Sequence, residues 1–350
     1  MSKTIVLTGG GTAGHVTPNI NLLPYINSYF DKIIYIGGDG IEKELTAHLP
    51  LDYYTIPTAK LKRSLAISNL LIPYKVYQGY REAKKILLAT KADVVFSKGG
   101  YVSVPVAFAC SRLHIPLIIH ESDLTFGLAN RIAKRFAQKV CTTYRETAHP
   151  LKNGLFVGAP IVSSPPKDAN IRRVRSMYHI SPLPVCLVVG GSLGAQKINE
   201  LIWKNLALLT RSHHVLHITG KGKANPSVKH PHYTQIEYSP YMNEVLTFTD
   251  IAITRGGSNM IFELLASDIP MLIIPLERGS RGDQIANAEY FARKGYALVL
   301  REKNLASFPE SFSSLVARSK FMRFNNRHIL PTNALEKIAS TLIECANSPS

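Results

Sequence analysis

Short apolar runs alternate with amphipathic stretches along the whole chain. In the first half, this pattern predicts strands at 4–8, 32–36, 92–97, 116–120 and 139–143, with helices at 18–29, 75–89, 103–112 and 127–137. In the second half, strands at 185–189, 214–219, 251–254 and 271–275 alternate with helices at 195–209, 241–248, 258–267 and 283–294. Such alternation is typical of parallel sheets that are covered by helices on both faces. We therefore predict an α/β protein.

Two glycine-rich turns follow apolar strands about half a chain apart, in Thr4–Asn19 and in Val185–Asn199. A strand that ends in such a turn and a helix N-terminus offers unpaired backbone N–H groups to a phosphate. The repetition predicts two similar domains that face one another and hold a nucleotide-linked substrate between them. The stretch 160–184, rich in proline, serine and charge, is the expected boundary and contains a short helix. Residues 331–346 are expected to form a helix that packs back across the junction.

The composition, with 45% hydrophobic and 19% charged residues in 350, is that of a globular protein. No apolar stretch approaches the ~20 residues of a membrane-spanning helix, and we expect no signal peptide. The four cysteines lack metal-ligand spacing, which favours a reducing cytoplasm. The chain has no Asp-x-Asp pair, so we expect no metal-bridged diphosphate. We also expect no cofactor.

The formal net charge of +17 indicates an anionic partner. Nucleic acid is disfavoured, because the chain has no zinc-finger spacing, RNP-like sequence or basic tail. The window 60–85 mixes large apolar residues with seven basic residues and one acid, Glu82. The basic residues are Lys60, Lys62, Arg63, Lys75, Arg81, Lys84 and Lys85. The mixture fits a segment that lies on a lipid surface, and it equally fits a solvated helix whose lysine stems cover core residues.

The loop Gly9–His15 lacks both the dinucleotide-binding spacing and the lysine of a P-loop. Thr17 and Pro18 predict an N-cap and first turn directly after it. At a helix N-terminus a cationic imidazole is disfavoured, so His15 is expected to be neutral and able to accept a proton. The alternative is a capping or packing histidine.

Two more strands of the first half end in polar loops, SKGGYVSVP at 97–105 and HESDLTFGLANRIAK at 120–134. An open α/β sheet places its ligands at the carboxyl ends of its strands. Glu121 and Asp123 are therefore candidates for a general base, or for hydrogen bonds to the loop backbone.

Three segments of the second half carry polar side chains at the same kind of position. Gly190–Gln196 offers Ser192 and a run of N–H groups to a diphosphate. Thr254–Ala266 is another strand, Gly-Gly turn and helix, in which Glu263 is suited to accept hydrogen bonds from the two hydroxyls of a ribose. Pro275–Phe291 adds the side chains of Arg281, Asp283, Gln284 and Asn287, which suit sugar recognition.

Six motifs in this order resemble the MurG family of bacterial peptidoglycan glycosyltransferases: GGGTAGHVTP, SKGGYVSVP, HESDLTFGLANRIA, GGSLGAQKIN, TRGGSNMIFE and SRGDQIANA. The resemblance covers essentially the whole chain. It implies a GT-B architecture of two Rossmann-like, doubly wound domains with an interdomain cleft. It implies an N-terminal acceptor and membrane-associating domain at 1–161, a UDP-N-acetylglucosamine-binding domain at 162–330 and a C-terminal helix within 331–350.

The resemblance also implies an inverting transferase that moves N-acetylglucosamine from UDP-N-acetylglucosamine to lipid I, giving lipid II and UDP. Carried over position by position, the substrate-binding residues are Thr12, Ala13, Gly14, Asp123, Ser192, Ser239, Ser258, Asn259, Glu263 and Gln284. Ser192 would contact phosphate, the backbone near Ser239 the uracil, Glu263 the ribose and Gln284 the sugar. His15 and Asp123 are the catalytic candidates for removing the proton of the acceptor hydroxyl.

Two positions depart from the family pattern. Asp123 stands where the family has an asparagine, and Val162 stands where an arginine often reaches the donor. Arg281 or Arg255 is expected to supply that contact instead.

Because the acceptor's lipid lies in the membrane, the resemblance favours the lipid-surface interpretation of the window 60–85. The expected membrane and acceptor contacts are Lys62, Arg63, Tyr101, Lys84 and Lys85, on a protein at the cytoplasmic face of the membrane. Other cell-wall synthesis and division proteins are further expected partners, and nucleic acid is not. The alternatives are a diacylglycerol glycosyltransferase, a UDP-N-acetylglucosamine epimerase, or a non-catalytic nucleotide-sugar-binding subunit.

Overall fold

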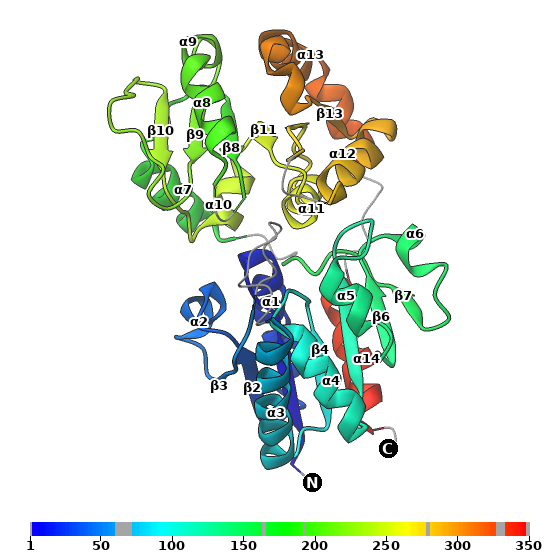
Figure 1. Ribbon diagram of the computed structural model, residues 1–350. Coiled ribbons are helices and arrows are strands. Elements are labelled where there is room, and N and C mark those ends of the chain that lie inside the picture. The colour runs from blue at the N-terminus through cyan, green and yellow to red at the C-terminus, as the bar shows by residue number, and fades with distance from the viewer. Residues whose placement is uncertain are drawn as a thin grey trace. The chain divides into compact units, whose positions relative to one another are not determined.

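The computed structural model describes residues 2–59, 72–162, 166–191, 194–277, 281–326 and 333–347. The chain forms two compact units. Unit 1 consists of Met1–Val162 with Pro331–Ser350, and unit 2 consists of Ser163–Leu330. Each unit is built on one parallel sheet flanked by helices (Figure 1).

Unit 1 contains a seven-stranded sheet in the order β3-β2-β1-β4-β5-β6-β7, whose neighbouring strands all pair in parallel. Its strands are β1 (Thr4–Thr8), β2 (Lys32–Gly37), β3 (Asp52–Thr55), β4 (Val94–Ser97), β5 (Leu117–Glu121), β6 (Lys139–Thr142) and β7 (Gly154–Phe156). Its helices are η1 (Ala13–His15), α1 (Thr17–Ile26), α2 (Ile41–Thr46), α3 (Ile72–Thr90), α4 (Ser103–Leu113), α5 (Leu128–Ala133), α6 (Arg145–Ala148) and α14 (Ala334–Asn347). The strand order reverses between β1 and β4, which is where such sheets bind ligands.

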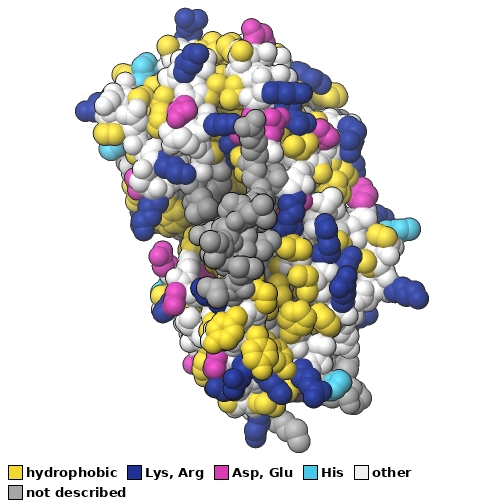
Figure 2. Space-filling model, in the orientation of Figure 1, with side chains coloured by type: hydrophobic (Ala, Val, Ile, Leu, Met, Phe, Trp, Pro, Cys, Tyr) yellow, Lys and Arg dark blue, Asp and Glu magenta, His cyan; other side chains and the backbone are white. Residues whose placement is uncertain are grey.

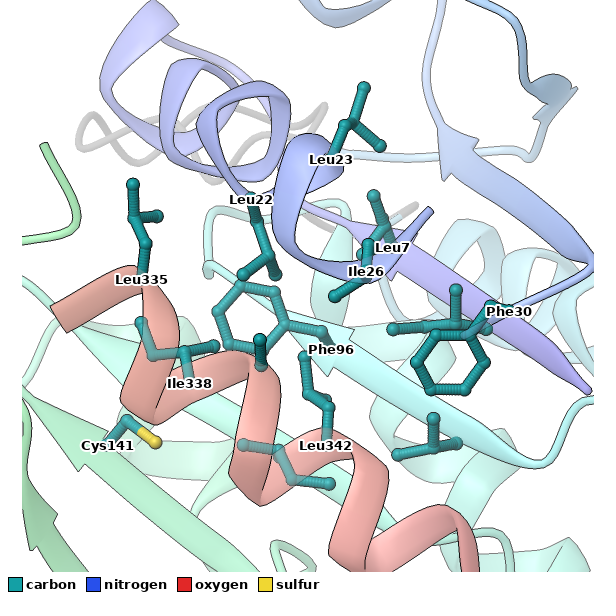
Figure 3. Packing of buried hydrophobic residues seen from close by; sticks show 14 of the residues in the cluster. Leu7, Leu22, Leu23, Ile26, Phe30, Phe96, Cys141, Leu335, Ile338 and Leu342 are labelled. Atoms are coloured by element: carbon teal, nitrogen blue, oxygen red, sulfur yellow. The ribbon is translucent and has the colours of Figure 1, made fainter. Parts of the chain in front are cut away.

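The C-terminal helix α14 is part of the core of unit 1. Its residues Leu335, Ile338 and Leu342 are buried in one apolar cluster with Leu22 of α1 and Phe96 of β4 (Figure 3). The same helix is held at its C-terminal end by Lys3, whose Nζ donates a hydrogen bond of 2.7 Å to the carbonyl oxygen of Ala346. The chain therefore returns to its first unit after forming the second.

Unit 2 contains a six-stranded parallel sheet in the order β10-β9-β8-β11-β12-β13. Its strands are β8 (Val185–Val189), β9 (His214–Ile218), β10 (Tyr233–Ile236), β11 (Ile251–Thr254), β12 (Met271–Ile273) and β13 (Ala297–Val299). Its helices are α7 (Asp168–Met177), α8 (Gln196–Lys204), α9 (Leu206–Leu209), α10 (Met242–Thr247), α11 (Ser258–Ala266), α12 (Asp283–Arg293), η3 (Glu302–Ser307) and α13 (Phe308–Asn326). Here the order reverses between β8 and β11.

The predicted α/β organisation is confirmed, and the strands predicted at 4–8 and 185–189 coincide with β1 and β8. Several boundaries were wrong. The helix predicted at 127–137 ends at Ala133, and the one at 195–209 breaks at Asn205, whose φ of −106° and ψ of 14° are not helical. Thr17 is the first helical residue rather than the N-cap, a position that Val16 occupies.

Candidate active site

The backbone of the first glycine-rich loop of unit 1 is hydrogen-bonded to a carboxylate of the same unit. Glu42 of α2 is fully buried, and its two oxygens accept backbone hydrogen bonds of 3.0 Å from Gly11 and from Gly38. The backbone N–H of Gly10 donates to the carbonyl oxygen of Gly99 in the loop after β4, at 3.3 Å. A Cβ on Gly100 would lie 2.2 Å from the Gly10 carbonyl oxygen, so this contact between the two loops requires glycine. The N–H groups of Gly10 and Gly11 are thus already used within unit 1.

His15 lies at the end of η1, directly after this loop. Its Nδ1 is 3.1 Å from the carbonyl oxygen of Gly10 and 3.1 Å from Oγ1 of Thr12. A carbonyl oxygen can only accept, so the geometry assigns the proton to Nδ1 and leaves Nε2 as an acceptor. Burial, and next the positive charge of Lys98, lower the pKa of His15 to about 4. The ring is therefore neutral at pH 7, as expected, although burial and Lys98 are the causes rather than a helix terminus.

Thr12, Ala13 and Gly14 belong to the same loop, and Tyr101 packs against it. Ala13 and Gly14 form η1 with His15, and a Cβ on Gly11 would lie 2.6 Å from Cε1 of Tyr101. The ring of Tyr101 therefore packs against the loop that carries His15. The structure brings these predicted residues together at the carboxyl end of β1.

Glu121, at the end of β5, binds the loop that follows it. Its Oε1 accepts a hydrogen bond of 3.0 Å from the N–H of Asp123, and its Oε2 accepts bonds of 3.0 Å from Gly127 N and from Nδ2 of Asn130. Of the two roles considered for Glu121, the structure shows the hydrogen bonds to loop backbone. Burial and the neighbouring Asp123 raise the pKa of Glu121 to about 7. Asp123 is half-buried at the start of this loop.

The sequence interpretation did not single out Lys98, the residue after β4. Its side chain is 1% exposed, and its Nζ donates a hydrogen bond to Oγ of Ser122. Its place directly before Gly99 and Gly100 was the only sequence feature that could have marked it. Lysines in loops are usually exposed to solvent, so this feature did not predict a buried side chain.

Two glycines in the loops of unit 2 have space for a further atom. A Cβ added to Gly191 or to Gly257 would have no neighbouring atom within 4 Å among the described residues. Gly191 follows β8 and Gly257 precedes α11, so both lie where the strand order of the second sheet reverses. Ser192, the predicted phosphate contact, lies outside the described residues.

Glu263, in the middle of α11, has a carboxylate with no hydrogen-bond or ion-pair partner among the residues that the structure describes. Burial alone raises its pKa to about 7. Ser258 and Asn259 form the first turn of the same helix, and the Ser258 side chain is buried. A desolvated carboxylate without a partner is well suited to accept hydrogen bonds from a ligand.

Gln284, in the first turn of α12, connects two loops of unit 2. Its Oε1 accepts hydrogen bonds from the N–H of Gly256 at 3.2 Å and from the N–H of Leu276 at 3.0 Å. Asn287, one turn later, donates from Nδ2 to the carbonyl oxygen of Gly256 at 3.0 Å. With its oxygen fixed in this way, the Gln284 amide holds its NH₂ group as a donor in a set position.

Ser239 is buried, and its Oγ lies 2.9 Å from the hydroxyl of Tyr178 and accepts a bond of 3.1 Å from Tyr241 N. Its hydroxyl serves the fold, which agrees with a role for the backbone rather than the side chain there.

The side chains of Arg255 and Arg281 differ in whether they can reach a bound sugar donor. Arg255 is buried, and its NH1 donates to the carbonyl oxygen of Ile274 at 3.0 Å and pairs with Glu302 at 2.7 Å. Burial opposes the ionisation of Glu302, but hydrogen bonds from Lys197 and Arg255 hold its pKa below the ordinary value. Arg281 is exposed just before α12. Of the two arginines considered as substitutes at Val162, Arg281 is therefore the available one.

Comparison with known proteins decides the family. The model of the glycosyltransferase family 28 N-terminal domain matches residues 5–142, and that of the family 28 C-terminal domain matches residues 185–342. This chain belongs to glycosyltransferase family 28. Within the family it groups with relatives named UDP-N-acetylglucosamine–N-acetylmuramyl-(pentapeptide) pyrophosphoryl-undecaprenol N-acetylglucosamine transferase. The relative from Shouchella clausii is 46% identical over 309 residues, 87% of each chain. The relative from Staphylococcus aureus MRSA252 is 44% identical over 314 residues, also 87% of each chain.

Solved structures agree on the fold of this family 28 enzyme. The crystal structure of Acinetobacter baumannii MurG has a TM-score of 0.74 at 21% identity and covers 98% of this chain and 100% of its own. A UDP-GlcNAc 2-epimerase from Neisseria meningitidis has a TM-score of 0.67 at 16% identity, with 98% and 100% coverage. These likenesses confirm the predicted GT-B fold. They do not separate a transferase from an epimerase, whereas the sequence relatives do.

The described part of this family 28 chain contains no group of three or more His, Cys, Asp or Glu that could hold a metal ion. No helix among the described residues is both long and apolar enough to cross a membrane.

Unit 1 carries an aromatic groove between α3 and α4. The groove has a volume of about 590 Å³ and is lined by Pro73, Val76, Tyr77, Tyr80, Phe108, Ser111, Arg112 and His114. Tyr74 and Tyr77 are 60% and 57% exposed. Figure 2 shows hydrophobic side chains gathered over this part of unit 1, with lysine and arginine side chains at the lower margin. Of the predicted contacts, Lys84 is half-buried on α3, Lys85 pairs with Glu82 at 3.0 Å, and Lys62 and Arg63 lie outside the described residues.

Proposed function

We propose that this chain transfers N-acetylglucosamine from UDP-N-acetylglucosamine to lipid I, with release of UDP and formation of lipid II. The observation that carries this proposal is the 44–46% identity to transferases of that name over 87% of the chain. The arrangement of donors and acceptors at the carboxyl ends of both sheets supports it.

Unit 2 is the proposed donor-binding unit. The ribose hydroxyls would donate to the carboxylate of Glu263, which has no partner among the described residues, and the sugar would accept from the NH₂ group of Gln284. The diphosphate would bind the open glycine turn at Gly191 with Ser192, and the N-terminus of α11 at Ser258 and Asn259. These N–H groups would stabilise the negative charge that grows on UDP as it leaves.

Unit 1 is the proposed acceptor-binding unit, and His15 is its proposed base. The Gly10 carbonyl fixes the proton on Nδ1, so Nε2 is free to take the proton of the acceptor hydroxyl as that oxygen attacks the anomeric carbon. The bond to UDP breaks on the opposite side of the sugar, which inverts the configuration. Thr12, whose Oγ1 lies 3.1 Å from Nδ1, would orient the ring, and Asp123 would contact the sugar.

The test is an assay with UDP-N-acetylglucosamine and a soluble lipid I analogue, in which UDP release and the disaccharide product are both measured. We expect one UDP for each disaccharide, and loss of at least ~100-fold of kcat in His15→Ala with little change in UDP binding. His149→Ala, at an exposed histidine of the same unit, is the matched control. Release of UDP without an acceptor would favour an epimerase, and transfer to diacylglycerol would favour the lipid-glycosylating alternative.

The surface formed by α3 and α4 is proposed to rest on the anionic cytoplasmic face of the membrane. Arg112 lines the aromatic groove, and Lys75, Arg81 and Lys84 lie on α3, which forms one side of it. None of these four side chains forms an ion pair among the described residues. Exposed tyrosines suit the headgroup region, and unpaired cations suit anionic lipids. This placement brings unit 1 to the lipid-linked acceptor.

A further inference from the structure

Lys98 is a buried lysine that the proposed mechanism does not yet use. Its side chain follows β4 at the reversal of strand order, is 1% exposed, and makes its one Nζ hydrogen bond among the described residues to Ser122. Lysines are almost never buried to this degree unless they are paired. A neutral residue would avoid the desolvation cost, so the fold alone does not explain a lysine here.

The charged groups around Lys98 lie at the end of β5 and in the loop that follows it. Glu121 and Asp123 attract the ammonium group, while burial acts more strongly and lowers the pKa of Lys98 to about 8. Lys98 is therefore still mainly protonated at pH 7. The loop that contains Asp123 is held from one side by the carboxylate of Glu121 and from the other by the contact between Lys98 and Ser122.

On the side of β1, Lys98 lies beside the loop that carries His15. Its backbone N–H donates to the carbonyl oxygen of Thr8 at 2.9 Å, and a Cβ on Gly9 would lie 3.2 Å from Cβ of Lys98 and 2.4 Å from the carbonyl oxygen of His15. The other elements that pack against η1 bring few charges toward the ring. Helix α1 has Tyr25 as its single titratable side chain, and Glu42 of α2 directs its carboxylate at backbone N–H groups. Tyr101 is uncharged, because burial raises the pKa of its hydroxyl. Lys98 is thus the cation among the described residues that acts on His15.

We propose that Lys98 is a positioning residue, whose buried ammonium group opposes protonation of the His15 ring and anchors the Ser122–Asp123 turn on the acceptor side. The proposal rests on the role given to His15 above. In this arrangement Lys98 touches no substrate. It acts by adding to the effect of burial on the imidazole, so that Nε2 remains available as an acceptor to a lower pH than burial alone would allow.

The test is an NMR titration of the His15 ring in the full-length protein carrying Lys98→Met, which keeps the length of the side chain and removes its charge. We expect the pKa of His15 to rise by about one pH unit, the effect of a charge a few ångströms away. The acid limb of the kcat/KM profile should move to higher pH by a similar amount. Lys98→Arg and Ser122→Ala, which both retain a cation, should leave the titration near that of the unchanged protein, as should Lys152→Met at an exposed lysine.

An unchanged titration of His15 in Lys98→Met would overturn the proposal, because a purely structural lysine would affect stability and not this pKa. Should that variant fail to fold, Lys98→Gln removes the charge, can still bond to Ser122, and carries the same expected result. The titration needs no substrate. A His15 that responds to Lys98 in a protein without transferase activity would therefore refute the proposed function and leave the electrostatic coupling intact.

Discussion

Replacing Glu263 with glutamine should stabilise unit 2 and weaken donor binding at the same time. The carboxylate of Glu263 has no partner among the described residues, and burial raises its pKa from 4.5 to about 7. An ionised carboxylate without a hydrogen-bond partner lowers the stability of the ligand-free protein. It is explained if a ligand supplies the missing donors.

The stability effect follows from linkage. The folded-state pKa lies above the unfolded-state value, so the folded protein binds the proton more tightly and loses stability as the pH rises from 4.5 to 7. The loss is complete above the folded-state pKa, where the difference corresponds to about 3 kcal/mol at most. Glu263→Gln removes this dependence. We expect the variant to be more stable by about 3 kcal/mol at pH 8 and by about 1 kcal/mol at pH 5.

Trp203, the one tryptophan of the chain, makes the measurement specific for unit 2. It lies in α8, and its Nε1 donates to the hydroxyl of Tyr233 at 2.9 Å. Urea unfolding followed by Trp203 fluorescence at both pH values gives the two differences. Parallel pH profiles for the variant and the unchanged protein would refute the idea that Glu263 carries a desolvated carboxylate.

The ligand arm uses calorimetric titration with UDP and with 2′-deoxy-UDP. Glu263→Gln should lower the affinity for UDP by about 10- to 100-fold, the worth of hydrogen bonds to a charged acceptor. The loss should be smaller for the deoxy ligand, because one of the two hydroxyl donors is already absent. Equal losses for both ligands would show that Glu263 does not contact the 2′-hydroxyl.

Two predictions concern unit 1. The combined change of Tyr77→Ser, Lys84→Glu and Arg112→Glu should strongly weaken sedimentation with anionic vesicles at low salt, because each basic residue removed from the surface costs about 1 kcal/mol of binding free energy. Lys152→Glu, at an exposed lysine, is the control. Unchanged binding of the triple variant would contradict a membrane contact at α3 and α4. Leu342→Ala in α14 should lower the calorimetric stability of unit 1 by about 2–5 kcal/mol because Leu342 is fully buried, whereas Leu88→Ala, at a side chain that is 57% exposed, should have little effect.

The fold was largely predictable because its central strands are continuous apolar runs. β1, β8 and β11 are buried along their whole length, so their sequences carry an unambiguous signal. The short outer strands β3, β7, β10 and β13 were not predicted. They lie at the sheet edges, where fewer positions are buried; β3 and β10 carry polar residues, and β7 and β13 are only three residues long. Helix α13 was missed for the related reason that its apolar residues follow no clear helical period.

The candidate site could be predicted only where a residue is identified by its own motif. His15, Glu263 and Gln284 each follow a glycine turn or open a helix, and such positions can be found in a sequence. Glu42 and Lys98 contribute through contacts between elements that are distant in the chain. No local pattern marks a carboxylate of α2 as the partner of Gly11, because the packing of α2 beside η1 creates that contact.

Glu42 makes the two glycine-rich turns chemically different although both follow the first strand of a doubly wound sheet. In unit 1 the N–H groups of Gly10 and Gly11 bind a carbonyl oxygen and a carboxylate of the protein itself. A phosphate entering there would have to displace Glu42 and would meet its negative charge. In unit 2 a Cβ on Gly191 of the corresponding turn, or on Gly257 in front of α11, would meet no atom within 4 Å among the described residues. The same backbone geometry therefore favours an anionic ligand in unit 2, and in unit 1 it provides a rigid support for the neutral ring of His15.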